Sequence, residues 1–143
     1  MMELVPFCVF TARPLADKPD FAGRTPLGQR VVVGVRDGRC EGERFTASQR
    51  GESAADWLII GPDGTAIPDV RMALRTDDGA FIYMTYQGRG DASDGLDGAT
   101  MYTAVTFEVA DERYAWLNTS LFVGKGSIDT SSSTVRYEIF QLR

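Results

Sequence analysis

Histidine is absent from all 143 residues of the chain, and this absence narrows the chemistry that the protein can perform. Without histidine there is no Ser/His or Cys/His pair to activate a nucleophile, and the commonest side-chain ligand of transition metals is missing. Any proton transfer must therefore use carboxylates, tyrosine, lysine, cysteine or bound water. We expect no metal site and no cofactor.

Cysteine and clustered positive charge are also scarce. Cys8 and Cys40 are the only two cysteines and lack metal-ligand spacing, so we expect buried thiols, with a disulfide as the alternative. Fifteen Lys and Arg residues against twenty Asp and Glu residues leave a net charge of −5. No stripe of basic residues is present to displace the counterions of a phosphate backbone, so nucleic acid is not an expected partner.

Long hydrophobic runs are missing. Runs such as Val31 to Val33 and Trp57 to Ile60 fall far short of the roughly 20 apolar residues that cross a membrane as a helix, so we expect no membrane span. The opening "MMELVPFCVF" has no basic segment or small-residue cleavage site, which favours a first strand and a cytoplasmic protein. A composition of 43% hydrophobic and 24% charged residues is typical of one soluble domain, here residues 1–143.

Helical periodicity is nearly absent, and strand-like segments separated by turn signals take its place. Asp37-Gly38, Pro62-Asp63-Gly64 and Asp78-Gly79 supply residues that tolerate positive φ, which predicts tight hairpins between antiparallel neighbours. The predicted strands are Glu3–Arg13, Gln29–Arg36, Arg39–Ser48, Asp56–Ile60, Thr65–Thr76, Ala80–Gly88, Thr100–Glu108, Ala115–Gly124 and Thr134–Leu142. A sandwich or a barrel can be built from them. Continuous meander order favours a single all-β antiparallel barrel of about eight strands, because closure removes exposed edges.

Three segments are predicted to be irregular. Pro14 to Leu27 contains three prolines and is expected to run over the surface and cover an opening. Gly88 to Ala99 is dense in Gly and Asp, and "SIDTSSST" before the last strand is similarly polar.

The stretch "DVRMALRTDDGAFIY", Asp69 to Tyr83, has two possible orientations. Alternation places Asp69 and Arg71 on one strand face and Val70 and Met72 on the other. The charged face lies either in solvent, as is usual for a half-buried sheet, or in the barrel lumen. If Asp77-Asp78-Gly79 forms a three-residue loop, Arg71 lies opposite Thr85 and shares its face with Tyr83. With a two-residue loop, Arg71 faces Tyr86 and Tyr83 moves to the face of Met72 and Leu74. We favour the three-residue loop.

A lumen orientation predicts a catalytic group of Asp56, Arg71 and Tyr83. A buried arginine needs a carboxylate partner, which Asp56 or Asp69 supplies, and its guanidinium suits a planar anion of a substrate. Tyr83 then serves as proton donor and an unpaired Asp as base, if burial shifts their pKa values toward neutrality.

An aromatic and amide lining is predicted from "RYAWLNTSLFVG". Trp116 and Asn118 share a face of the predicted strand and pair an apolar wall with a hydrogen-bonding amide. The alternative is that Trp116 is ordinary core and Asn118 begins a bend. Together with Trp57 and Asp69, these two residues are the candidate substrate-binding group.

Three motifs carry a resemblance to a known family: "ADWLIIGPDGTAIPDVRMALRTDDGAFIY", "FEVADERYAWLNTSLFVGKG" and "GERF". The chain resembles, over nearly its whole length, the small proteins grouped as domain of unknown function 3237. The resemblance implies a compact antiparallel β-barrel similar to allene oxide cyclase, dirigent and lipocalin-like barrels, which host small apolar molecules. It also implies that the candidate residues above are the family's motif positions, and it favours an interior site.

Three functions are compatible with such a barrel. The first is a cofactor-free lyase, isomerase or cyclase that acts on a small aromatic or polyketide-like carbonyl compound. The second is a non-catalytic, lipocalin-like ligand carrier, and the third is a structural protein whose polar strand residues form a contact between subunits. The expected partner is a small apolar or aromatic molecule, and a homo-oligomer is possible on this interpretation.

Overall fold

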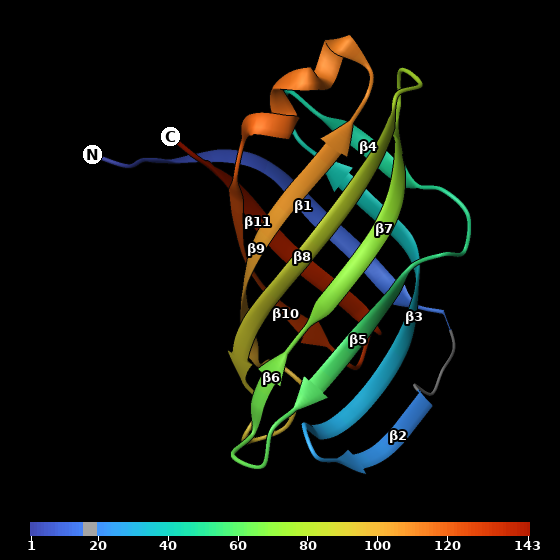
Figure 1. The fold of residues 1–143 in the computed structure, drawn as a ribbon, viewed down its shortest axis with the longest axis vertical. Helices are drawn as coiled ribbons and strands as arrows, with labels where there is room; N and C mark the ends of the chain where they lie inside the picture. Colours follow the sequence, from blue (N-terminus) through green and yellow to red (C-terminus); the bar gives the residue numbers. More distant parts are fainter. Residues whose placement is uncertain (16–19) are drawn as a thin grey trace.

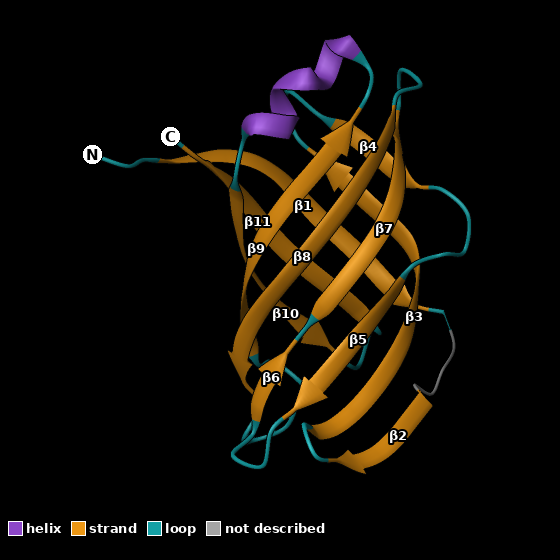
Figure 2. Ribbon diagram, viewed as in Figure 1, coloured by secondary structure: helices purple, strands orange, loops and turns teal. Residues whose placement is uncertain are grey.

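The protein is an antiparallel β-barrel in a computed structural model that describes residues 1–15 and 20–143. Figure 1 shows the strands winding obliquely around one axis, and Figure 2 shows the short helix at one end of the barrel. The strands are β1 (Leu4–Pro14), β2 (Asp20–Thr25), β3 (Gly28–Glu41), β4 (Thr46–Gln49), β5 (Ala55–Ile60), β6 (Thr65–Ile67), β7 (Asp69–Thr76), β8 (Phe81–Asp91), β9 (Thr100–Val109), β10 (Phe122–Asp129) and β11 (Thr134–Leu142), with the 3₁₀ helix η1 (Glu112–Thr119) before β10.

The β1–β3 ladder closes the sheet, so ten strands form the barrel and β2 extends from its rim. β4 and β5 both pair with β3 in succession, and β6 and β7 both pair with β8 in succession. β4 and β5 therefore share one strand position in the barrel, and β6 and β7 share another. The predicted barrel is confirmed. The prediction of about eight strands is lower than the observed ten, because two of the strand positions are each divided between two shorter strands.

Asp37-Gly38 is a bulge within β3, so the predicted hairpin at this position is wrong. Asp37 has φ of 57°, as the turn signal indicates, but the strand continues on both sides of it. The extra residue reverses the alternation, so that Val35 before the bulge and Cys40 after it are both buried in the barrel. The connection to β4 lies at residues 42–45 instead.

Residues 112–119 form η1, so the predicted strand Ala115–Gly124 is wrong over its first half. Asp111 caps the helix by accepting a hydrogen bond from Arg113 N at 3.0 Å, and the side chain of Asn118 then pairs with the backbone of Val109. These local side-chain contacts compete with strand pairing.

Two of the predicted irregular segments contain more strand than expected. In Pro14 to Leu27, residues 20–25 form β2 on one edge of β3, and residues 16–19 lie outside the described part of the chain. In Gly88 to Ala99, β8 continues to Asp91 before the loop, in which Gly95 and Gly98 adopt positive φ.

The half of the barrel next to η1 is filled with side chains. Phe7 stacks with Phe45 at 5.2 Å between ring centroids and packs against Phe122 at 4.6 Å. Aliphatic side chains from β7, β8 and η1 complete this core: Met72, Leu74, Ile82, Met84 and Leu117. These side chains occupy the lumen at this end of the barrel. Among the described residues, no helix has the length and apolar character needed to span a membrane.

Candidate functional site: a carboxylate and two phenols in the barrel lumen

The β7–β8 hairpin has the three-residue loop that the sequence favours. Thr76 N donates to Ala80 O at 2.8 Å, and Arg71 lies opposite Thr85 in the ladder. The register prediction is confirmed. The face of β7 that carries Arg71 points outward, because Val70 and Met72 are buried and Arg71 is exposed. An interior arginine would require the opposite orientation of this strand.

Four of the predicted site residues therefore lie on the outer face of the barrel, and their expected place in the lumen is wrong. The Arg71 guanidinium lies over the ring of Trp57, 4.4 Å from its centroid. Asp69 and Tyr83 share the face of Arg71, and Gln87 Nε2 approaches Asp69 Oδ1 at 3.5 Å. The physical reason is that the alternate side chains of β7 are aliphatic, and their burial in the barrel costs no charge desolvation.

Asp56 is the predicted catalytic residue whose side chain points into the lumen. It lies opposite Val70 on β7 and Val33 on β3, and Val70 is fully buried. Asp56 Oδ1 accepts a hydrogen bond from Asp69 N at 3.0 Å. Burial raises the pKa of Asp56 from its ordinary 3.8 to about 6, the backbone hydrogen bond opposes this shift, and the charge of Asp69 adds to it.

Two tyrosines that the sequence analysis did not select share this lumen. Tyr86 lies opposite Val70, and Tyr137 lies opposite Phe10, with 5.4 Å between the centroids of the two phenol rings. Burial raises the pKa of both phenols, and the nearby charge of Asp56 raises both further. The signal that identifies Tyr86 is the ladder register, since Tyr86 faces inward whenever Val70 does.

The hydroxyl groups of these tyrosines have no hydrogen-bond partner among the described residues. Across residues 1–15 and 20–143, no protein group hydrogen-bonds to either phenol oxygen. Yet no side-chain oxygen in that part of the chain is both fully buried and without a partner.

Asp56 lies toward the end of the barrel near β2, because its partner Val33 follows the part of β3 that pairs with β2. Asp56, Val33 and Val135 face inward by their ladder positions but are only partly buried. β2 pairs with β3 alone among the described strands, and Figure 1 shows it standing away from β10 and β11 at this end of the barrel.

Trp116 and Asn118 lie at the opposite end of the barrel, so the structure does not bring them to Asp56. Trp116 packs edge-on against Phe7 at 5.9 Å between centroids. Asn118 accepts from Val109 N at 2.9 Å and donates to Val109 O at 2.8 Å, which fixes η1 to the end of β9. The shared strand face predicted for these two residues does not exist, because both are in η1.

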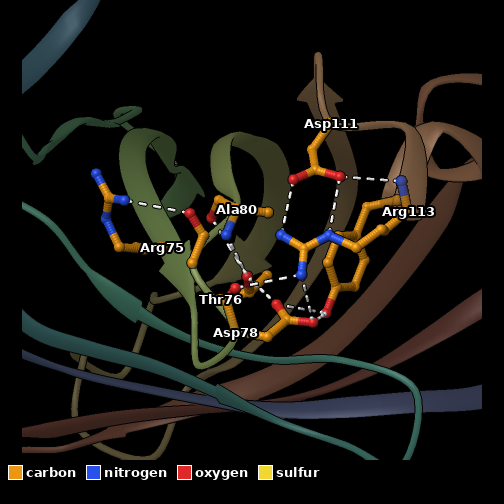
Figure 3. Close-up of polar contacts among 8 residues, drawn as sticks. Arg75, Thr76, Asp78, Ala80, Asp111 and Arg113 are labelled. Atoms are coloured by element: carbon orange, nitrogen blue, oxygen red, sulfur yellow. Dashed lines mark hydrogen bonds and ion pairs between the residues drawn. The ribbon is translucent and has the colours of Figure 1, made fainter.

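A polar network holds η1 over this closed end (Figure 3). The Tyr114 hydroxyl donates to Asp78 Oδ2 at 2.8 Å, and Arg113 forms ion pairs with Asp78 at 3.2 Å and with Asp111 at 2.8 Å. Thr76 Oγ1 also donates to Asp78 Oδ1 at 2.6 Å. The Thr-Asp-Asp-Gly motif and the Tyr-Ala-Trp-Leu-Asn motif therefore have a structural role, which is to attach η1 to the β7–β8 hairpin.

The family model described as "Protein of unknown function (DUF3237)" matches residues 3–142. The chain belongs to this family. A UPF0311 protein of Clostridium acetobutylicum is 29% identical to it over 128 residues, which cover 80% of each chain. The family resemblance identified from the sequence is confirmed.

Solved structures of similar proteins have the same barrel. A β-barrel-like protein from Acinetobacter baumannii is 26% identical with a TM-score of 0.89, covering 100% of this chain and 97% of its own. A protein of unknown function from Rhodopseudomonas palustris is 24% identical with a TM-score of 0.88, covering 100% and 99%. A structure described as an enzyme from Penicillium herquei is 21% identical with a TM-score of 0.67, covering 100% and 94%, and at this identity it shows the fold alone.

Proposed function

We propose that the lumen binds a small, uncharged aromatic or polyketide-like carbonyl compound and that Asp56 transfers a proton on it, so that the protein is a cofactor-free isomerase, cyclase or lyase. The observation that carries this proposal is the position of Asp56, which faces the two phenols within a largely apolar lumen. A carboxylate left partly unpaired in such a place is costly for folding and is typical of functional sites.

Asp56 has the properties of a general base near neutral pH. With a pKa of about 6 it is mostly ionised at pH 7, and it binds a proton more tightly than an ordinary aspartate. One of its oxygens is held by Asp69 N, and this contact orients the carboxylate. It would remove a proton from the carbon next to the substrate carbonyl.

Tyr86 and Tyr137 would act on the carbonyl oxygen. Their raised pKa values keep both phenols protonated at neutral pH, so both can donate a hydrogen bond to the negative charge that forms on that oxygen. The surrounding apolar side chains exclude water and strengthen these interactions.

The charges of the lumen favour an uncharged substrate. The buried polar or charged side chains in the described residues are Thr76, Thr103 and Gln141, and no arginine or lysine is among them. An anionic substrate would meet the negative charge of Asp56 without a compensating buried cation among the described residues. This is a change from the sequence-based model, in which Arg71 fixed an anionic oxygen.

The test is hydrogen–deuterium exchange of 2-tetralone, an uncharged aromatic ketone, in D₂O, followed by NMR. We expect the protein to accelerate exchange next to the carbonyl and Asp56→Asn to lose about a hundredfold or more of the acceleration. The double variant Tyr86→Phe/Tyr137→Phe should lose activity with Asp56 intact. Arg71→Ala is the matched control and should keep full activity, because Arg71 lies on the outer face.

Two results would count against proton transfer by Asp56. Equal exchange with the wild-type protein and Asp56→Asn would refute the role of this residue. No acceleration by the wild-type protein, combined with a small molecule retained in native mass spectrometry, would favour the non-catalytic carrier.

A further inference from the structure

A second concave surface lies at the opposite end of the barrel, beside η1. The groove has a volume of about 650 Å³, and three arginines line it: Arg44, Arg113 and Arg143. No Asp or Glu side chain is among the described residues that line it, although Glu41, Glu43 and Glu138 line a neighbouring groove that Arg44 and Arg143 also border. In a protein with a net charge of −5, three guanidinium groups around one groove without an acidic lining residue require an explanation.

Arg44 is held in place without a carboxylate partner. Its guanidinium lies over the ring of Trp116 at 4.7 Å from the centroid, and its Nη2 donates to Gln141 Oε1 at 2.8 Å. Among the described residues, no Asp or Glu lies within ion-pair distance of it. The positive charge of Arg44 is therefore oriented but not neutralised.

The groups behind Arg44 are fixed by a chain of hydrogen bonds. Gln141, which is 7% exposed, donates from Nε2 to Ser120 Oγ at 3.0 Å, and Ser120 Oγ donates to Trp116 O at 2.8 Å. The amide of Gln141 is thus oriented with its oxygen toward Arg44. This order lowers the conformational entropy that Arg44 would lose on binding a ligand.

The two remaining arginines differ in their charge balance. Arg113 forms ion pairs with Asp111 and Asp78, so its charge is compensated. Arg143, like Arg44, has no acidic side chain within ion-pair distance in the part of the chain that the structure describes. The guanidinium groups of Arg44 and Arg143 therefore both border the groove without an ion-paired side chain, and two guanidinium groups suit the several oxygens of a phosphate better than the two of a carboxylate.

We propose that this groove binds the phosphoryl group of a small phosphate monoester, with Arg44 and Arg143 as its two ligands. The planar guanidinium donates two parallel hydrogen bonds to phosphate oxygens, and Arg44 has its remaining N–H groups free for this contact. The site is independent of the lumen, because the packed aromatic and aliphatic core separates η1 from Asp56.

Binding is tested by titrating ¹⁵N-labelled protein with phenyl phosphate, inorganic phosphate and benzoate. The readout is the indole N–H resonance of Trp116, assigned by comparison with Trp57→Phe. We expect saturable shifts with phenyl phosphate and inorganic phosphate that weaken as NaCl is added. Benzoate, a monoanion with the same ring, should bind at least about tenfold more weakly than phenyl phosphate, because it carries half the charge.

Variants locate the contact. Arg44→Met keeps an apolar stem over Trp116 and should weaken phenyl phosphate binding about tenfold or more, as should Arg143→Gln. Arg75→Gln is the matched control: it removes the same charge from another exposed arginine, which contacts Gly79 O, and should leave affinity unchanged. Absence of a saturable Trp116 shift with either phosphate, equal affinity for benzoate, or an equal loss in Arg75→Gln would each overturn the proposal.

Discussion

The ring of Tyr137 occupies the space that a side chain at Gly126 would need. The two residues lie opposite one another in the β10–β11 ladder, and a Cβ atom at Gly126 would lie 2.5 Å from Tyr137 Cδ1 and against the carbonyl oxygen of Arg136. The absence of a side chain at Gly126 therefore allows the phenol to lie across the lumen toward Tyr86.

Gly126→Ala is expected to destabilise the protein by about 1–3 kcal/mol, because the added methyl group overpacks against the Tyr137 ring and the backbone. Urea unfolding with fluorescence detection measures the change. Ser127→Ala, at the next, half-exposed position of β10, is the control and should change stability by less than about 0.5 kcal/mol. Equal stability of Gly126→Ala and the wild-type protein would show that the ring can move aside at no cost.

Asp56 should make the folded protein more stable as the pH falls from about 7 to about 5. The pKa of Asp56 is raised to about 6 in the folded state, so the folded protein takes up a proton that the unfolded chain does not yet bind. A difference of about two pKa units corresponds to about 3 kcal/mol as an upper estimate. Asp56→Asn should remove this dependence and be more stable than the wild-type protein at pH 7.5.

Urea unfolding at pH 7.5 and pH 5 tests this linkage. Asp129→Asn is the control: the pKa of Asp129 is lowered by hydrogen bonds from Ser131 and Ser132, so its substitution should not stabilise the protein at pH 7.5. A wild-type stability that decreases between pH 7 and pH 5 while Asp56→Asn behaves identically would contradict the assigned burial of the carboxylate.

The rate of proton transfer should fall as the pH decreases through about 6, since protonated Asp56 cannot act as a base. The exchange rate of 2-tetralone measured between pH 5 and pH 8, after subtraction of the buffer rate, gives the profile. An ordinary aspartate would instead lose activity only near pH 4. A flat profile between pH 5 and pH 8 would exclude Asp56 as the base.

Asn118→Ala is expected to cost about 1–3 kcal/mol of stability, because it leaves both the N–H and the carbonyl of Val109 without their partner. Asn118→Asp keeps the acceptor for Val109 N but loses the donor to Val109 O, so it should also be destabilising. Thermal unfolding measures both. Thr119→Ala, at the exposed neighbouring position, should have a small effect, and similar losses in all three variants would show that the contact is not specific.

Much of the architecture follows from the sequence through local rules. Alternating apolar residues and glycine-containing turns predict an antiparallel barrel, and the loop Asp77-Asp78-Gly79 predicts the register between Arg71 and Thr85, which the structure confirms. Both depend on residues close together in the chain. Asp56 was also a candidate, but as the carboxylate partner of an interior Arg71, which the structure places on the outer face.

Tertiary structure decided which face of each strand is inside. Alternation in β7 separates Arg71 from Val70, but only closure of the barrel determines that Val70 is buried and that Tyr86, opposite it, enters the lumen. Asp37 adopts positive φ in a bulge as readily as in a turn, so its local preference does not distinguish them. The sequence by itself determined most of the strands and the register of the β7–β8 hairpin, because these depend on local conformation, whereas the lumen site depends on side chains that distant strands bring together.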